Sequence, residues 1–230
     1  MPLASNTRFK MAAILIYAAI AILLWRGWAI RPIACNANDW TWSFCLGTLP
    51  QVATFLLFGL IPMGIVKFLF KEKLSDYGVG IGITKYTVRS FLLTAPVIVG
   101  IGLLAGHDPL FFDVYPLNEA IRPQQARIGI GIFFIHALLY LSYYWGWEFF
   151  FRGFLQHGLS EKTGLLLAVL LQTALSTALH VGHPVSEMIG AVVAGFYWGF
   201  LAVRTKSILS GFLQHALLGI VLDAVLVFGR

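Results

Sequence analysis

The chain has 230 residues, of which 59% are hydrophobic and only 11% are charged. Soluble domains carry about a quarter charged residues, so this composition excludes an ordinary soluble protein and favours a polytopic membrane protein. The net charge of +6 is explained by membrane topology and contact with anionic lipids, and it gives little support to nucleic-acid binding. We predict a single membrane domain over residues 1–230, built only from helices.

Several apolar stretches approach the roughly 20 residues that a helix needs to cross a hydrocarbon core about 30 Å thick. Helices are expected because backbone amides find no other partners in lipid. We predict an all-α bundle of about seven spans, within a range of roughly six to eight. The predicted spans are 11–30, 50–70, 87–106, 128–151, 164–181, 187–203 and 207–229.

Two short features lie outside the candidate site. Cys35 and Cys45 both fall in the first loop after a span, where a disulfide and two free thiols are both open. Ala191, Gly195 and Gly199 follow one another at four-residue spacing, a pattern typical of closely packed membrane helices.

The basic residues predict how the spans are oriented. With the N-terminus inside, 11 of the 16 basic residues fall on the inner side, which satisfies the positive-inside rule. The polar segment 71–82 is then an inner loop, turning at its glycines, and the acidic segment 107–120 is an outer loop. The five outer residues are Arg26, Arg31, Arg122, Arg127 and Arg230.

Apart from Lys67 and Arg89 at the flanks of their spans, ionisable residues enter deep into the spans only in the second half of the chain. Charged groups inside a membrane are costly, so they usually face the bundle interior and indicate function. The chemistry is therefore expected after about residue 140. These residues are Glu148, Arg152, His180, His183, Glu187, His215 and Asp223.

Glu148 and Arg152 are four residues apart, so they are neighbours on one face of a helix. A buried ion pair that only fixes helix packing is one interpretation. Desolvation makes such a pair a weak stabiliser, so a functional role is equally open.

Three more ionisable residues close the predicted fifth span and begin the sixth. His180, His183 and Glu187 lie within eight residues, with Pro184 between them. Their spacing differs from HExxH, in which two histidines share a helical face, so we predict no metal site and no cofactor. A carboxylate and histidines shielded from water can activate a water molecule and stabilise an oxyanion. Together with His215 in the last span, the pattern favours hydrolysis.

The motif order "WEFFFRGFL", a histidine closing the next span, and "GFYWGFLAVRTKSILSGFLQHAL" resembles the CPBP family, which contains CAAX proteases and bacteriocin-processing enzymes. The likeness covers roughly residues 140–225, and residues 128–229 are predicted to form the CPBP-like catalytic core. The resemblance implies an intramembrane endopeptidase that cuts a peptide or membrane-protein substrate. It also implies catalytic roles for Glu148, His180 and His215, with Arg152 in support.

The sequence departs from the family pattern at three positions. Trp147 replaces the first glutamate, the usual general base, and Ser176 replaces the phenylalanine of the second motif. Gly219 stands where the third motif has Asn or Asp. Glu187 or Glu148 is expected to replace the missing base, and Asp223 is expected to compensate in part for the missing Asn.

Two further interpretations stay open. A catalytically inactive scaffold or immunity protein would tolerate Trp147, and a small transporter would use the buried charges as an ion path, although the motif order argues against transport.

The predicted spans place Glu148 and His180 at different depths in the membrane. With a turn near 158–164, Glu148 and His180 would differ in depth by roughly 9 Å, unless the helix tilts or continues past Arg152.

We expect an integral protein of the bacterial plasma membrane with a cytoplasmic N-terminus. In a variant without the native cysteines, Ser75→Cys should resist labelling by an impermeant thiol reagent added to intact cells, because segment 71–89 faces inward. A cysteine at Asp113 in the outer loop should be labelled. Labelling of Ser75→Cys would reverse the predicted orientation.

Overall fold

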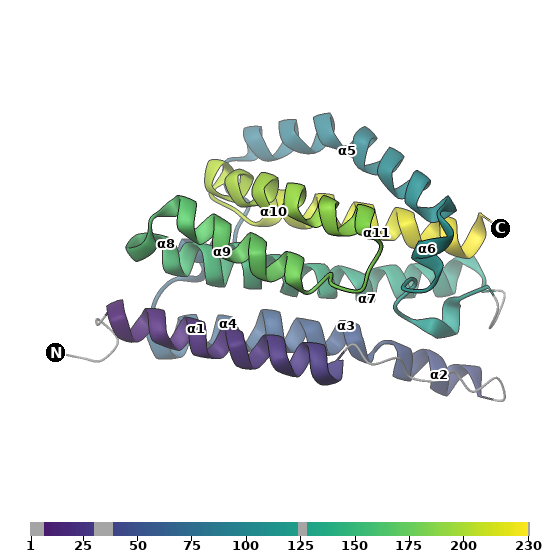
Figure 1. Ribbon diagram of the computed structural model, residues 1–230, viewed down its shortest axis with the longest axis horizontal. Coiled ribbons are helices and arrows are strands. Elements are labelled where there is room, and N and C mark those ends of the chain that lie inside the picture. The colour runs from purple at the N-terminus through teal and green to yellow at the C-terminus, as the bar shows by residue number, and fades with distance from the viewer. Residues whose placement is uncertain (1–6, 30–38, 124–127, 230) are drawn as a thin grey trace.

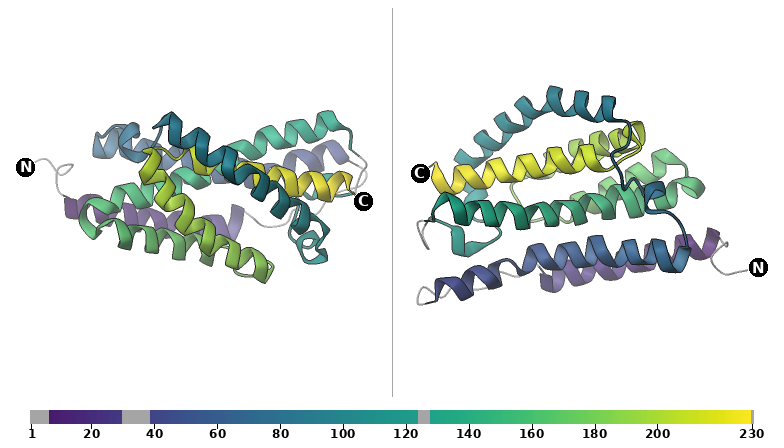
Figure 2. Two further views of the ribbon diagram at one scale, coloured as in Figure 1. Left: turned by 90° about the horizontal axis from the view of Figure 1, so that it is seen from above. Right: turned by 180° about the vertical axis from the view of Figure 1, so that it is seen from behind.

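The protein is a bundle of long helices in the computed structural model, which describes residues 7–29, 39–123 and 128–229. Helix α5 covers one face of the bundle, and α1 together with α3 and α4 covers the opposite face (Figures 1 and 2). Helices α7, α9, α10 and α11 lie between these two faces, so the chain has its core in the second half.

The helical segments come in two sets, one before and one after the central loop. The first set comprises α1 (Thr7–Leu24), η2 (Trp25–Ala29), α2 (Trp40–Gly47), α3 (Leu49–Thr54), η3 (Phe55–Leu60), α4 (Ile61–Gly64), η4 (Ile65–Phe70), η5 (Leu74–Tyr77), α5 (Thr84–His107) and α6 (Pro109–Phe112). The second set comprises η6 (Glu119–Ile121), α7 (Ile130–Glu148), η7 (Phe149–His157), α8 (Gly158–Thr163), α9 (Leu165–Ala178), α10 (Val185–Thr205) and α11 (Leu209–Phe228).

Within the described residues, six continuous helices are long and apolar enough to cross a membrane, which confirms the polytopic all-α prediction. They are Thr7–Gly27, Trp40–Phe70, Thr84–His107, Ile130–Thr163, Val185–Thr205 and Leu209–Phe228. The predicted fifth span is a shorter apolar helix, α9, of 14 residues. The start of α1 and the end of α11 lie at opposite ends of the bundle, as seven passes require (Figure 1).

Two predicted boundaries were wrong. The Trp-rich segment after Asp39 is helical and belongs to the second span, because the Asp39 side chain accepts a hydrogen bond from the Trp42 amide and caps α2. The fourth span runs on to Thr163, since a helix that is buried among other helices can stay apolar on all sides. Of the two cysteines, whose pairing was left open, Cys35 lies outside the described residues, as do Arg31, Arg127 and Arg230 from the orientation argument.

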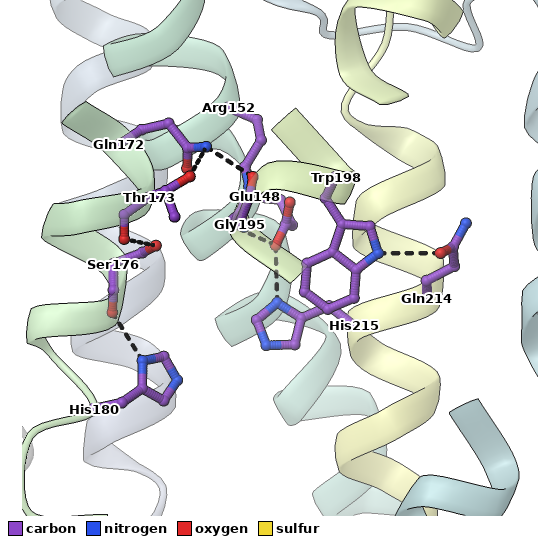
Figure 3. A network of polar contacts seen from close by, with 10 residues as sticks. All are labelled: Glu148, Arg152, Gln172, Thr173, Ser176, His180, Gly195, Trp198, Gln214 and His215. Atoms are coloured by element: carbon purple, nitrogen blue, oxygen red, sulfur yellow. Dashed lines mark hydrogen bonds and ion pairs between the residues drawn. The ribbon is translucent and has the colours of Figure 1, made fainter. Parts of the chain in front are cut away.

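The fourth helix continues past Arg152 as far as Thr163, one of the two conditions set by the sequence for bringing Glu148 and His180 to one depth. The chain turns at Gly164, which has a φ of 77° and separates α8 from α9. Glu148 lies sixteen residues before this glycine and His180 sixteen residues after it. Glu148 nevertheless lies beside Thr173 of α9 (Figure 3), because the π-helical stretch Phe149–His157 rises less per residue than an α-helix does.

The segments predicted to face inward meet at one end of the bundle. Lys10 of α1 donates to Glu72 at 2.7 Å, and Ile83 donates its amide to the Thr205 carbonyl at 2.7 Å. Gly82 has a φ of 66° and lies directly against Thr205, where a side chain would collide with the carbonyl. The loop after η4 is therefore tied to the turn between α10 and α11, and both belong to one side of the membrane.

Small residues on α10 let it approach α9 and η7 closely. A methyl group added at Gly195 would lie 2.7 Å from Thr173, and one at Gly199 would lie 2.9 Å from Gln156. The freed space admits two amides, because Gln172 donates to the Gly195 carbonyl at 2.9 Å and Gln156 to the Gly199 carbonyl at 2.8 Å. The predicted packing role of the small residues is confirmed at these two glycines.

We expect Gly146 to be essential for stability, because α7 packs there against the backbone of the second span. An added methyl group would lie 2.9 Å from the Thr54 carbonyl oxygen. Gly146→Ala should lower the free energy of unfolding by about 1–3 kcal/mol, as overpacking does. Gly131→Ala on the same helix has open space and should be neutral or slightly stabilising. Thermal unfolding in detergent measures both, and equal behaviour of the two variants would contradict the packing argument.

Candidate functional site

The segment that carries Arg152 is the most enclosed part of the bundle. In η7, every residue from Phe149 to Gln156 is buried, so this π-helical stretch is surrounded by protein. Isolated π-helical turns occur often at functional sites, since the wider turn re-aims the side chains around it. The aromatic residues of "WEFFFRGFL" therefore form the inner packing that holds the two charged groups.

Glu148 is fully buried, and one of its oxygens receives two hydrogen bonds (Figure 3). Arg152 Nη1 donates to Oε1 at 3.1 Å, and His215 Nδ1 contacts the same oxygen at 2.8 Å. An ionised carboxylate only accepts, so Nδ1 of His215 carries the proton in this pair. Nε2 is then the ring nitrogen of His215 that is left for a group in the neighbouring cavity.

The contact between Glu148 and His215 is one step of a polar seam between α7 and α11. Each helix presents four residues at four-residue spacing, which places them on one face. We define the α7–α11 seam as His136, Tyr140, Tyr144 and Glu148 on α7 and Gly211, His215, Gly219 and Asp223 on α11.

The two glycines of the seam make room for larger groups of α7. A methyl group at Gly211 would lie 2.8 Å from Glu148 Oε2, and one at Gly219 would overlap the hydroxyl of Tyr144. The Tyr144 ring also packs on the imidazole of His215, with 4.5 Å between the ring centroids. Because Gly211 and Gly219 have no side chains, Glu148 and Tyr144 of α7 can each lie close to the backbone of α11.

Trp198 holds the other side of His215. Its indole is 4.6 Å from the imidazole and donates from Nε1 to Gln214 Oε1 at 3.0 Å. The guanidinium of Arg152 lies over the same indole at 5.5 Å. These contacts leave His215 little rotational freedom, because its two faces and Nδ1 are all occupied.

A second cluster is built around His180 at the end of α9. His180 Nδ1 lies 2.8 Å from the Ser176 carbonyl oxygen, which can only accept, so Nδ1 carries the proton. Nε2 then presents a lone pair and lies 3.8 Å from Glu187 Oε1. Two acceptors at this separation can each receive one hydrogen of a shared water molecule.

Glu187 is held by two further groups from different segments. Tyr115 donates its hydroxyl to Oε1 at 2.7 Å, and His183 Nδ1 lies 2.9 Å from the same oxygen. Burial, and then the charge of Glu187, raise the pKa of Tyr115 well above its usual value, so this phenol remains a donor. Oε2 of Glu187 is buried without a hydrogen-bond partner among the described residues.

Both clusters border a cavity of about 730 Å³. His180, Glu187, His215 and Arg152 line it, whereas Glu148 lies behind His215 and is buried. The two histidines thus line the cavity directly, whereas Glu148 is connected to it through His215. Side chains of α5, α7, α9, α10 and α11 all contribute to the wall.

Trp147, at the position of the missing glutamate, stands between the two clusters. Its ring lies 5.6 Å from the imidazole of His180 and 6.4 Å from that of His215. An indole offers one donor and no acceptor, so it cannot take a proton from water. The carboxylate beside His180 in this chain is Glu187.

Asp223 does not take the place of the missing Asn beside His215, contrary to the sequence prediction. Its Oδ2 is 2.8 Å from His136 Nε2, and both side chains are buried. Eight residues place Asp223 two turns beyond His215, so its reach is toward the opposite end of the seam. The group that fills the space beside Gly219 is Tyr144.

Four contributing residues were missed from the sequence: Tyr115, His136, Tyr144 and Trp198. His136 and Tyr144 had a signal, because they repeat at four-residue spacing toward Glu148. Tyr115 comes from a loop, and no periodicity connects a loop to a distant helix. Among the described residues, no group of three His, Cys, Asp or Glu side chains is arranged to hold a metal ion.

Residues 129–221 match the family described as type II CAAX prenyl endopeptidase Rce1-like. Over this segment the chain is similar to the CAAX-protease family. The match confirms the resemblance drawn from the three motifs, and it implies an integral membrane protein related to membrane peptidases. No curated protein and no solved structure matches the chain.

We expect the buried pair of Glu148 and Arg152 to be costly to break. Glu148→Gln leaves the guanidinium buried without a counter-charge, so the free energy of unfolding should fall by about 3–5 kcal/mol. Glu119→Gln removes the carboxylate of a partly exposed pair with Arg122, at 3.8 Å, and should cost at most about 1 kcal/mol. Thermal unfolding in detergent compares the two, and similar losses would contradict a special cost of burial.

Proposed function

We propose that the protein is a membrane-embedded endopeptidase of the CAAX-protease type, in which Glu187 has replaced the usual base. The observation that carries this proposal is the arrangement around Glu187. One carboxylate lies 3.8 Å from the free nitrogen of His180, anchored by Tyr115 and His183 and bordering the cavity. His180, Glu187 and His215 would be the catalytic residues, with Glu148, Arg152 and His183 in support.

In the proposed mechanism, a water molecule binds between His180 Nε2 and the Glu187 carboxylate. Glu187 takes a proton from this water as its oxygen attacks the carbonyl carbon of the scissile peptide. The same proton is then delivered to the amide nitrogen as the carbon–nitrogen bond breaks. Tyr115 and His183 both bind Oε1, which keeps the carboxylate oriented beside His180.

His215 forms the opposite wall of the proposed site. Its Nδ1 is fixed by Glu148, so Nε2 can face the tetrahedral intermediate. In its protonated form the imidazole would donate to the developing oxyanion, and the Glu148 carboxylate would stabilise the positive ring. Arg152 keeps Glu148 in place and balances its charge inside the bundle.

The wall of the cavity supports a substrate with a hydrocarbon part. Apolar residues of α5 and α10 line one side, among them Val97, Ile101, Leu104, Ile189 and Val193. These same residues are exposed on the outside of the bundle, where lipid would lie. The matched family is named for prenyl endopeptidases, and we propose that this chain too cuts a lipid-modified peptide at the surface of the bacterial plasma membrane.

Glu187→Gln should abolish cleavage while leaving the protein folded. We expect turnover to fall at least about a hundredfold, as for removal of a general base. The assay is cleavage of a prenylated peptide by purified protein in detergent, with the unprenylated peptide in parallel. Glu161→Gln, at the far end of α8, is the matched control and should retain activity.

Near-wild-type turnover of Glu187→Gln would remove Glu187 from the mechanism. Failure of the unmutated protein to cut any peptide would instead favour the inactive scaffold, in which the same contacts only stabilise the bundle.

A further inference from the structure

The α7–α11 seam places a phenol beside His215 where the sequence motif offers only a glycine. Tyr144 reaches across from α7 and sets its hydroxyl against the backbone of Gly219. Any side chain at position 219 would overlap this hydroxyl, so the glycine and the tyrosine depend on each other. Tyr144, His215 and Gly219 all line the same cavity.

We propose that Tyr144 is a catalytic residue that donates its hydroxyl hydrogen to the substrate oxyanion, next to His215. This inference rests on the proposed peptidase function and adds a residue to it. A tetrahedral intermediate in peptide hydrolysis carries a negative oxygen, and such oxygens are usually held by more than one fixed donor. His215 alone would provide one donor.

The surroundings make Tyr144 suitable for this task. Its ring is fixed on both sides, by His215 at 4.5 Å and by Tyr140 at 4.6 Å between ring centroids. A phenol also carries its proton near neutral pH, so it donates without prior protonation. The imidazole of His215 donates from Nε2 only when it is protonated, because Nδ1 is bound to Glu148.

The side-chain donors of Trp198 and Gln214 near His215 are committed elsewhere, whereas Arg152 Nε has no hydrogen-bond partner among the described residues. The indole of Trp198 donates to Gln214 at 3.0 Å, and the amide of Gln214 donates to Ser210 at 3.1 Å. Arg152 Nη1 donates to Glu148. Tyr144 is therefore the neighbour of His215 that lines the cavity, has a ring packed against other aromatic rings, and places its hydroxyl against Gly219 of α11.

Tyr144→Phe tests the role with the smallest possible change. We expect kcat to fall by about 10²- to 10³-fold, as for loss of one oxyanion donor, with KM and the melting temperature unchanged. Tyr86→Phe is the control, because it removes the hydroxyl of a tyrosine that does not line the cavity and contacts Arg204 instead. Its kcat should stay within about twofold of wild type, on the usual scale of neutral substitutions.

A second variant tests whether Tyr144 needs the space that Gly219 leaves beside α11. Gly219→Ala should displace the phenol and lower kcat, and the double variant with Tyr144→Phe should lose little more than Gly219→Ala alone. Full kcat in Tyr144→Phe, an equal loss in Tyr86→Phe, or additive losses in the double variant would each overturn the inference. These outcomes are measured against active wild-type protein, whereas an inactive wild type would overturn the proposed peptidase function itself.

Discussion

The hydrogen bonds that Glu148 receives at the centre of the bundle are the interactions on which the rest of the site depends. A fully buried carboxylate is tolerable only with compensating charge and donors, and Arg152 and His215 provide both. Because these partners come from η7 and α11, one carboxylate joins the fourth and last spans. The same bond fixes the tautomer and the rotation of His215.

The two clusters that border the cavity are built by different means. Glu148 and His215 lie on long helices packed through the seam, which gives them rigid positions. Glu187 and His180 lie at helix ends, and their arrangement depends on the loop that delivers Tyr115. An inner wall of fixed geometry thus faces a wall assembled from a turn and a loop, with Trp147 between them.

Departures from the family motifs occur together with replacements in space. Where the first glutamate is missing, Trp147 packs on His180 and Glu187 brings a carboxylate to the same imidazole. Where the third-motif side chain is missing at Gly219, Tyr144 occupies the space. Each replacement comes from another helix, so it is visible only when the helices are packed.

The sequence by itself determined the membrane class, the helical fold and the neighbours along one helix, such as Glu148 and Arg152. These follow from composition, length and helical spacing, which are local properties. The tertiary structure decided which groups meet across helices: Asp223 with His136, Tyr115 with Glu187, and Tyr144 with Gly219. It also set the length of the fourth span, because burial among other helices lets an apolar helix continue past the width of the membrane. Such contacts depend on how helices rotate and tilt against one another, and a four-residue period fixes only the face, not the partner that it meets.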